Sequence, residues 1–138
     1  MPVVASSSTS VRGTSRAPAW HTSTTPNGTV SIPAGLLIKV GDQVVYHLGD
    51  TALFSDLQLV ARRGDGVDVA LVPIGGHYTM DRFDAVTAVE LIAPKTVIPC
   101  HYDTFPPIET DAEAFKSDVE SSTGASVVIL QPGETHST

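Results

Sequence analysis

The chain has 138 residues, of which 41% are hydrophobic, so it can form one globular domain with a modest core. Its 15 acidic residues outnumber its 8 basic residues, and the resulting net charge of −7 argues against a general nucleic-acid or membrane-surface binder. The single cysteine, Cys100, excludes an internal disulfide, and no apolar run approaches transmembrane length. We therefore expect a cytoplasmic protein that binds neither nucleic acid nor membrane.

The first 16 residues differ in composition from the rest of the chain. They are rich in Ser and Thr, contain no acidic residue, and lack the apolar core of a secretory signal. We predict a disordered leader over residues 1–16 and a folded domain over residues 17–138.

Strand-like apolar runs alternate with helix-like segments along the domain. Gly41-Asp42 suits a tight hairpin turn, and Ser55 is placed to cap a short helix. The strongest helix begins at Asp81 and ends before Pro94. Its apolar positions near one face are Phe83, Val86, Val89 and Ile92. The predicted strands are 36–40, 44–48, 67–74, 96–100 and 126–130, and the predicted helices are 55–63, 81–93 and 111–122.

This order, a β-hairpin followed by α-β-α-β-α-β, indicates the α/β class. Continuous apolar strands that alternate with helices are typical of a largely parallel sheet covered by helices.

Two side chains that can bind metal follow predicted strands. Asp50 comes after strand 44–48 through Gly49, and His101 comes directly after strand 96–100. Open α/β sheets collect ligands at the carboxyl ends of their strands, and a carboxylate with an imidazole can form part of a metal site. Asp50 could equally cap a turn, and His101 could be a core histidine with satisfied hydrogen bonds.

The other candidate side chains carry weaker signals. Neighbours on a strand point to opposite faces, so Cys100 is not expected to share a metal with His101 and is interpreted as a small buried apolar residue. His77 follows Gly75-Gly76 in a loop that could line a substrate pocket or be merely polar. Nothing local marks His21 as a ligand, His47 is interpreted as structural, and His136 as solvated.

Three longer stretches resemble a known family. They are residues 46–56 (Tyr-His-Leu-Gly-Asp-Thr-Ala-Leu-Phe-Ser-Asp), 72–80 (Val-Pro-Ile-Gly-Gly-His-Tyr-Thr-Met) and 97–108 (Val-Ile-Pro-Cys-His-Tyr-Asp-Thr-Phe-Pro-Pro-Ile). Together they are similar to the metallo-β-lactamase superfamily, in its branch of metal-dependent hydrolases related to ascorbate-6-phosphate lactonase. The likeness spans about residues 17–134 and implies the C-terminal half of an αββα sandwich.

The resemblance also implies site residues and a cofactor. His21, Asp50 and His101 fall on the family's metal ligands, with Asp50 bridging two ions, His21 serving the first and His101 the second. His77 and Thr79 would line the substrate pocket. The ions, zinc or alternatively manganese or iron, would activate a water molecule by lowering its pKa.

The chain departs from the family at one motif. No His-x-His-x-Asp-His string precedes the first ligand, although that motif supplies four of the family's seven protein ligands. A catalytic zinc generally takes three protein ligands, so we expect doubtful metal occupancy and impaired hydrolysis in this chain. A late gene start or an upstream frame error would explain the missing motif.

We therefore expect a metal-dependent hydrolase of a small ester, lactone or phosphorylated metabolite. The alternative is a non-catalytic half-domain that pairs with itself, as a homodimer, or with a separate N-terminal half. A nuclease of the same superfamily is disfavoured, because the net charge of −7 offers little attraction for phosphates.

Overall fold

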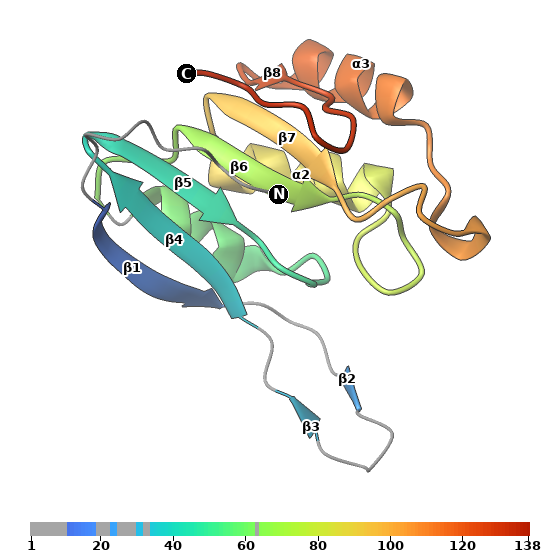
Figure 1. Cartoon of the computed structure of the whole chain (residues 1–138), viewed down its shortest axis with the longest axis horizontal. Helices are drawn as coiled ribbons and strands as arrows, with labels where there is room; N and C mark the ends of the chain where they lie inside the picture. Colours follow the sequence, from blue (N-terminus) through green and yellow to red (C-terminus); the bar gives the residue numbers. More distant parts are fainter. Residues whose placement is uncertain (1–10, 19–22, 25–29, 32–33, 63) are drawn as a thin grey trace.

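One mixed sheet organises the molecule. The computed structural model describes residues 11–18, 23–24, 30–31, 34–62 and 64–138. In this part of the chain a six-stranded sheet has the order β1-β4-β5-β6-β7-β8, with β2 (Ser23–Thr24) and β3 (Val30–Ser31) forming a separate two-stranded ribbon (Figure 1). The prediction of an α/β fold is confirmed.

The sheet has an antiparallel and a parallel part. The antiparallel part is β1 (Val11–Pro18), β4 (Ala34–Val40) and β5 (Gln43–His47). The predicted tight turn joins β4 to β5, and Gly41 adopts a φ of 61° there, a conformation that glycine reaches without steric cost. The parallel part continues from β5 through β6 (Val69–Pro73), β7 (Thr96–Cys100) and β8 (Ser126–Val127).

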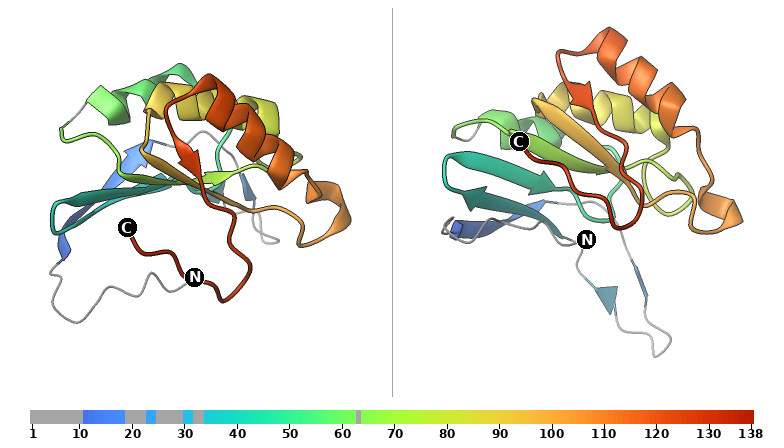
Figure 2. Two further views of the ribbon diagram at one scale, coloured as in Figure 1. Left: turned by 90° about the horizontal axis from the view of Figure 1, so that it is seen from above. Right: turned by 45° about the horizontal axis from the view of Figure 1, so that its top comes forward.

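All helices cover one face of the sheet (Figure 2). They are the short 3-10 turn η1 (Ser55–Leu57) leading into α1 (Gln58–Arg62), then α2 (Arg82–Ile92) and α3 (Ala112–Ser122). The main core lies between these helices and the sheet, and its largest fully buried side chains include Tyr46, Leu48, Leu57, Ile74 and Phe115. A second 3-10 turn, η2 (Pro106–Ile108), lies in the β7–α3 connection.

The opposite face carries a second apolar cluster. Val69, Leu71 and Ile98 are buried there. The segment after β8 crosses this face (Figure 2), and its Val128 and Leu130 pack against the three residues. This segment therefore covers part of the sheet face that the described helices leave uncovered.

Helix boundaries follow local chemistry where a cap is present. Asp81 caps α2, because its carboxylate accepts hydrogen bonds from the backbone N–H groups of Phe83 and Asp84, both at 2.9 Å. Asp111 caps α3 in the same way through Ala114 N–H at 2.8 Å. The prediction that Ser55 caps the first helix is wrong, because its hydroxyl hydrogen-bonds the Asp56 carboxylate and leaves the backbone uncapped.

Three further predictions need correction. Residues 11–16, assigned to the disordered leader, lie in β1, which pairs with the edge of β4 and satisfies that strand's backbone groups. Phe83 is 62% exposed, because α2 turns its small residues Ala85 and Ala88 toward the core with Val89 and Ile92. The last strand is shorter than residues 126–130, because Val128 N–H makes the final bond to β7, at the Val97 carbonyl, before the chain crosses the sheet face.

Candidate metal centre

Asp50 and His101 lie together at the carboxyl ends of β5 and β7. The distance between Asp50 Oδ1 and His101 Nε2 is 3.8 Å. Parallel pairing through β6 explains this, since it brings the ends of β5 and β7 to the same edge of the sheet. The sequence prediction placed each residue past a strand, and the fold makes them neighbours.

The backbone turn that leads from β5 to Asp50 depends on Gly49. Gly49 has a φ of 71°, and a Cβ there would lie 2.9 Å from the Ala34 carbonyl oxygen. The Gly49 N–H donates to His47 Nδ1 at 3.0 Å. Partial burial lowers the pKa of His47 below its usual value, with Asp50 opposing the shift, so the ring is neutral near pH 7 and Nδ1 can accept this bond. His47, interpreted as structural, thus helps to hold the turn that presents Asp50.

His101 sits in a strained backbone conformation. Its φ is 55°, and nearby Asp103 has a φ of 57°, both uncommon for residues with a Cβ. The ring is partly exposed, with Nε2 on the side of Asp50. Its Nδ1 is buried and has no hydrogen-bond partner in the part of the chain that the structure describes. Strained residues of this kind concentrate at functional sites.

The Asp50–His101 pair can contribute two metal ligands. Two ligands about 2.1 Å from a tetrahedral zinc lie about 3.4 Å apart, so the observed 3.8 Å requires only a small adjustment. Among the described residues, however, no group of three His, Cys, Asp or Glu side chains could hold a metal. Since a catalytic zinc takes three protein ligands, these residues alone do not complete a catalytic site.

The remaining predicted site residues have different outcomes. His21 lies outside the described residues. His77 is exposed with a φ of 53°, and Thr79 is half-buried, both in the loop between β6 and α2. This loop borders the Asp50 segment, because Met80 N–H donates to the Thr51 carbonyl at 3.2 Å. Thr79 Oγ1 is buried and finds no partner among the described residues.

Among the described residues, Cys100 does not join Asp50 and His101 as a third metal donor. It packs against the apolar cluster of Val69, Leu71 and Ile98, on the sheet face opposite the described helices. Burial raises the pKa of its thiol to about 12, and the nearby Asp50 carboxylate adds to the shift. This agrees with its interpretation as an apolar packing residue. His136 is exposed in the C-terminal segment, as predicted.

Two features of this edge were not predicted from the sequence. Gly75 makes a close approach, since a Cβ there would lie 2.3 Å from the His101 carbonyl oxygen and 2.9 Å from Ile108 Cβ. The loop that follows β6 and the loop that follows β7 are therefore packed together at Gly75. Next to them, Tyr78 and Phe105 expose aromatic rings 6.1 Å apart. The Gly75-Gly76 pair was the only signal in the sequence, and it did not specify a partner.

Comparison with known proteins gives the family. A model described as β-lactamase superfamily domain matches residues 7–101, which include β1, Asp50 and His101. The chain belongs to the metallo-β-lactamase superfamily. The match begins inside the segment that we assigned to a leader, in agreement with the position of β1 in the sheet.

Several relatives in this superfamily are named UPF0173 metal-dependent hydrolases. The chain is 48% identical over 118 residues to one from Thermus thermophilus, which covers 85% of this chain and 51% of the relative. It is 51% identical over 118 residues to one from Staphylothermus marinus, with 86% and 49% covered. The chain thus spans about half the length of the curated relatives it matches.

Two solved structures of metal-dependent hydrolases superpose on this chain. Igni18, described as a metallo hydrolase from Ignicoccus hospitalis, superposes with a TM-score of 0.78 at 43% identity, covering 88% of this chain and 51% of that one. A metal-dependent hydrolase described from Parabacteroides distasonis gives a TM-score of 0.66 at 25% identity, with 84% and 49% covered. Within the described residues, no helix is long and apolar enough to cross a membrane.

Proposed function

We propose that this chain is part of a metal-dependent hydrolase that acts on a small ester, lactone or phosphorylated metabolite. The observation that carries the proposal is the approach of Asp50 and His101 to 3.8 Å at the carboxyl edge of the parallel strands. Two relatives of which this chain spans about half, from Thermus thermophilus and Staphylothermus marinus, are named metal-dependent hydrolases, and these names support the same reaction class.

The chain's own residues would bind one side of a divalent cation, with zinc preferred and manganese or iron as alternatives. A bound cation of this kind supplies an activated water molecule for hydrolysis. As the resemblance implies, Asp50 would serve two ions, with His21 on the first and His101 on the second, and His77 and Thr79 are proposed to border the substrate. The two described donors fall short of a catalytic set, so no catalytic step is assigned, and we propose that hydrolysis is impaired in this chain alone.

Metal binding tests the assignment directly. Zinc titration of the full chain, purified without an affinity-tag metal, should show binding that Asp50→Ala and His101→Ala each weaken at least about tenfold, by loss of one ligand. His136→Ala is the matched control, because His136 is exposed in the C-terminal segment. Equal binding by all four proteins would remove Asp50 and His101 from the site. Rapid hydrolysis of generic esters by the chain alone, abolished by Asp50→Ala, would overturn the proposed impairment.

A second candidate function is that of a half-domain that pairs with itself or with a separate N-terminal half. The observation that favours it is the apolar sheet face opposite the helices. Leu36 is 42% exposed. It pairs with His47 of β5, and His47 pairs on its other side with Leu71 of β6, so Leu36 lies on the same sheet face as the cluster that contains Leu71. A stable monomer by light scattering at high concentration would count against pairing with itself.

A further inference from the structure

The loops beside Asp50 and His101 carry an exposed aromatic group. His77 packs edge-on against Tyr78, with ring centroids 4.3 Å apart, and Tyr78 lies 6.1 Å from Phe105. Tyr78 is 50% exposed and Phe105 is 42% exposed. We call these three residues the aromatic rim.

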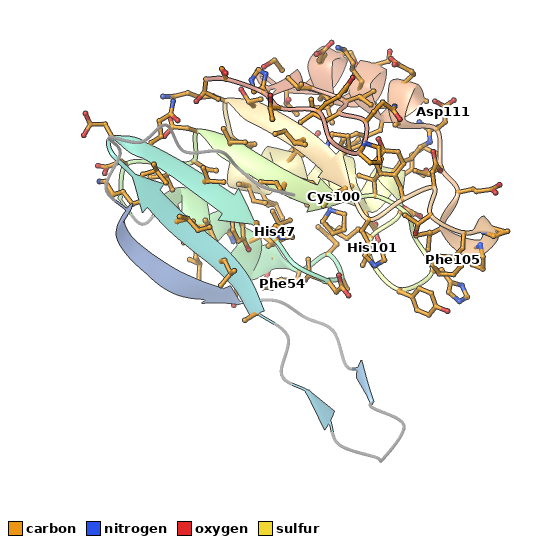
Figure 3. All side chains as sticks on the ribbon, viewed as in Figure 1. His47, Phe54, Cys100, His101, Phe105 and Asp111 are labelled. Carbon is orange, nitrogen blue, oxygen red and sulfur yellow. The ribbon has the colours of Figure 1, made fainter. Side chains whose placement is uncertain are left out.

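Hydrogen bonds and one close approach fix the rim next to the candidate metal centre. The Tyr78 loop is joined to the Asp50 segment by the bond from Met80 N–H to the Thr51 carbonyl. It is joined to the His101 segment by the bond from Ile74 N–H to the Cys100 carbonyl at 3.1 Å, and by the contact at Gly75. In the view of Figure 3, His101 lies between His47 and Phe105 along this edge.

Hydrogen bonds within the loop after β7 fix the conformation of the backbone that carries Phe105. Asp103 N–H donates to the Ile108 carbonyl at 3.0 Å, and the Asp103 carboxylate accepts from Thr110 N–H at 2.8 Å. Asp103 and His77 both keep a positive φ, a conformation that costs free energy and persists only where the surrounding contacts offset that cost. These contacts hold Phe105 and Tyr78 in place although their rings face solvent.

The charge at this edge selects against anions. The three segments that meet there, residues 48–54, 75–81 and 101–111, contain no lysine or arginine. They do contain Asp50, Asp81, Asp103, Glu109 and Asp111. Nearby Arg82 is engaged, because its guanidinium pairs with Asp118 and stacks 4.2 Å from the Phe83 ring centroid. Apart from the proposed cation itself, a phosphate group would meet carboxylates here without a lysine or arginine partner.

We propose that the aromatic rim binds the hydrocarbon part of an uncharged ester or lactone, and that phosphorylated metabolites are not substrates. The inference rests on the proposed hydrolase function and selects among its substrate classes. The exposed faces of Tyr78 and Phe105 offer aromatic contact area beside the position where Asp50 and His101 would hold the metal. The rings are too close to enclose another ring, so the substrate group lies across them.

The test measures binding without turnover. N-benzylacetamide, an uncharged probe that resists hydrolysis, is titrated against the full chain by ligand-observed NMR. Benzyl phosphate carries the same ring with negative charge, and N-methylacetamide carries the same amide without the ring. We expect both to bind at least about tenfold more weakly than N-benzylacetamide, because one adds repulsion and the other lacks the apolar group.

Variants locate the binding on the rim. The double variant Tyr78→Ala/Phe105→Ala should weaken N-benzylacetamide binding about tenfold, whereas Tyr78→Phe/Phe105→Tyr, which keeps both rings, should restore it. Leu59→Ala is the control, because Leu59 is a similarly exposed apolar residue, 40% accessible, on α1. Both aromatic side chains are exposed, so their removal leaves the core intact.

The outcomes separate this inference from the hydrolase proposal. Selective N-benzylacetamide binding by a chain whose zinc binding does not depend on Asp50 and His101 supports the rim and contradicts the proposed metal-dependent hydrolase. Zinc binding that Asp50→Ala weakens, together with N-benzylacetamide binding that the double alanine variant leaves unchanged, contradicts the rim alone. The inference is also overturned if the wild-type chain does not bind N-benzylacetamide, if benzyl phosphate binds equally well, or if the variants change only the oligomeric state.

Discussion

Gly75 is the residue on which the arrangement of the site depends most directly. It allows the loop after β6 to lie against the His101 carbonyl oxygen. A Cβ at Gly75 would lie only 2.3 Å from that oxygen. No side-chain rotation can relieve such a contact, because the facing atom belongs to the backbone. The backbone around His101 would have to move, and with it the imidazole next to Asp50.

We expect Gly75→Ala to lower the free energy of unfolding by about 1–3 kcal/mol, as overpacking does. Urea unfolding followed by circular dichroism measures the change. Gly124→Ala is the control, because a Cβ at Gly124 meets nothing within 4 Å, and it should change stability by less than about 0.5 kcal/mol. Equal stability of the two variants would show that the loops after β6 and β7 are not packed as described.

At the scale of elements, Asp68 joins three strands at the edge of the sheet away from the site. It lies just before β6, and its carboxylate accepts from Val44 N–H of β5 and from Lys95 Nζ just before β7, both at 2.7 Å. The Lys95 hydrogen bond is the main cause of a lowered pKa for Asp68, and burial opposes it. Asp68 therefore helps to set the register of the parallel strands whose other ends carry Asp50 and His101.

Asp68→Asn should lower the free energy of unfolding by about 1 kcal/mol at pH 7, because a charge-assisted bond is lost while an exposed lysine remains solvated. Since the pKa of Asp68 is lower in the folded state, its stabilising effect is full above the unfolded value near 3.8 and is lost as the pH falls through the folded value.

Urea midpoints of the wild type and the Asp68→Asn variant should accordingly converge as the pH is lowered toward 3. Asp65→Asn, which removes a fully exposed partner of Lys39, is the control and should change stability less at every pH. A constant difference between the wild type and Asp68→Asn across this pH range would contradict the assigned ion pair.

At the scale of the whole molecule, the sheet has one face covered by helices and one covered only in part by the C-terminal segment (Figure 2). The partly covered face carries the cluster around Leu71 and the exposed Leu36. Exposed apolar surface of this kind favours association.

If the proposed pairing of two copies uses this face, Leu36→Lys should weaken the dimer at least about tenfold by placing a charge in an apolar contact. Light scattering over a concentration series measures the dimer constant. Leu59→Lys, an equally exposed position on the helical face, should leave it unchanged. Loss of association in both variants alike would point to a general effect of charge.

The local elements were predictable because their signals are local. The cap at Asp81 and the stop at Pro94 determine α2 almost to the residue, and Gly41 determines the hairpin between β4 and β5. The predictions from the sequence were wrong where tertiary packing outweighs the local hydrophobic pattern. Phe83 lies outside the buried face because alanines allow α2 a closer approach, and β1 forms because β4 needs a partner at its edge.

The sequence by itself determined the helices and most strands of the domain, the fold class, the family and the two residue types that could bind metal. The tertiary structure decided that Asp50 and His101 meet, because parallel pairing through β6 brings two distant strand ends to one edge. It also decided that Tyr78 and Phe105 lie side by side, since the close approach at Gly75 depends on atoms remote in the chain. Such contacts have no local pattern, because the residues involved become neighbours only when the sheet is assembled.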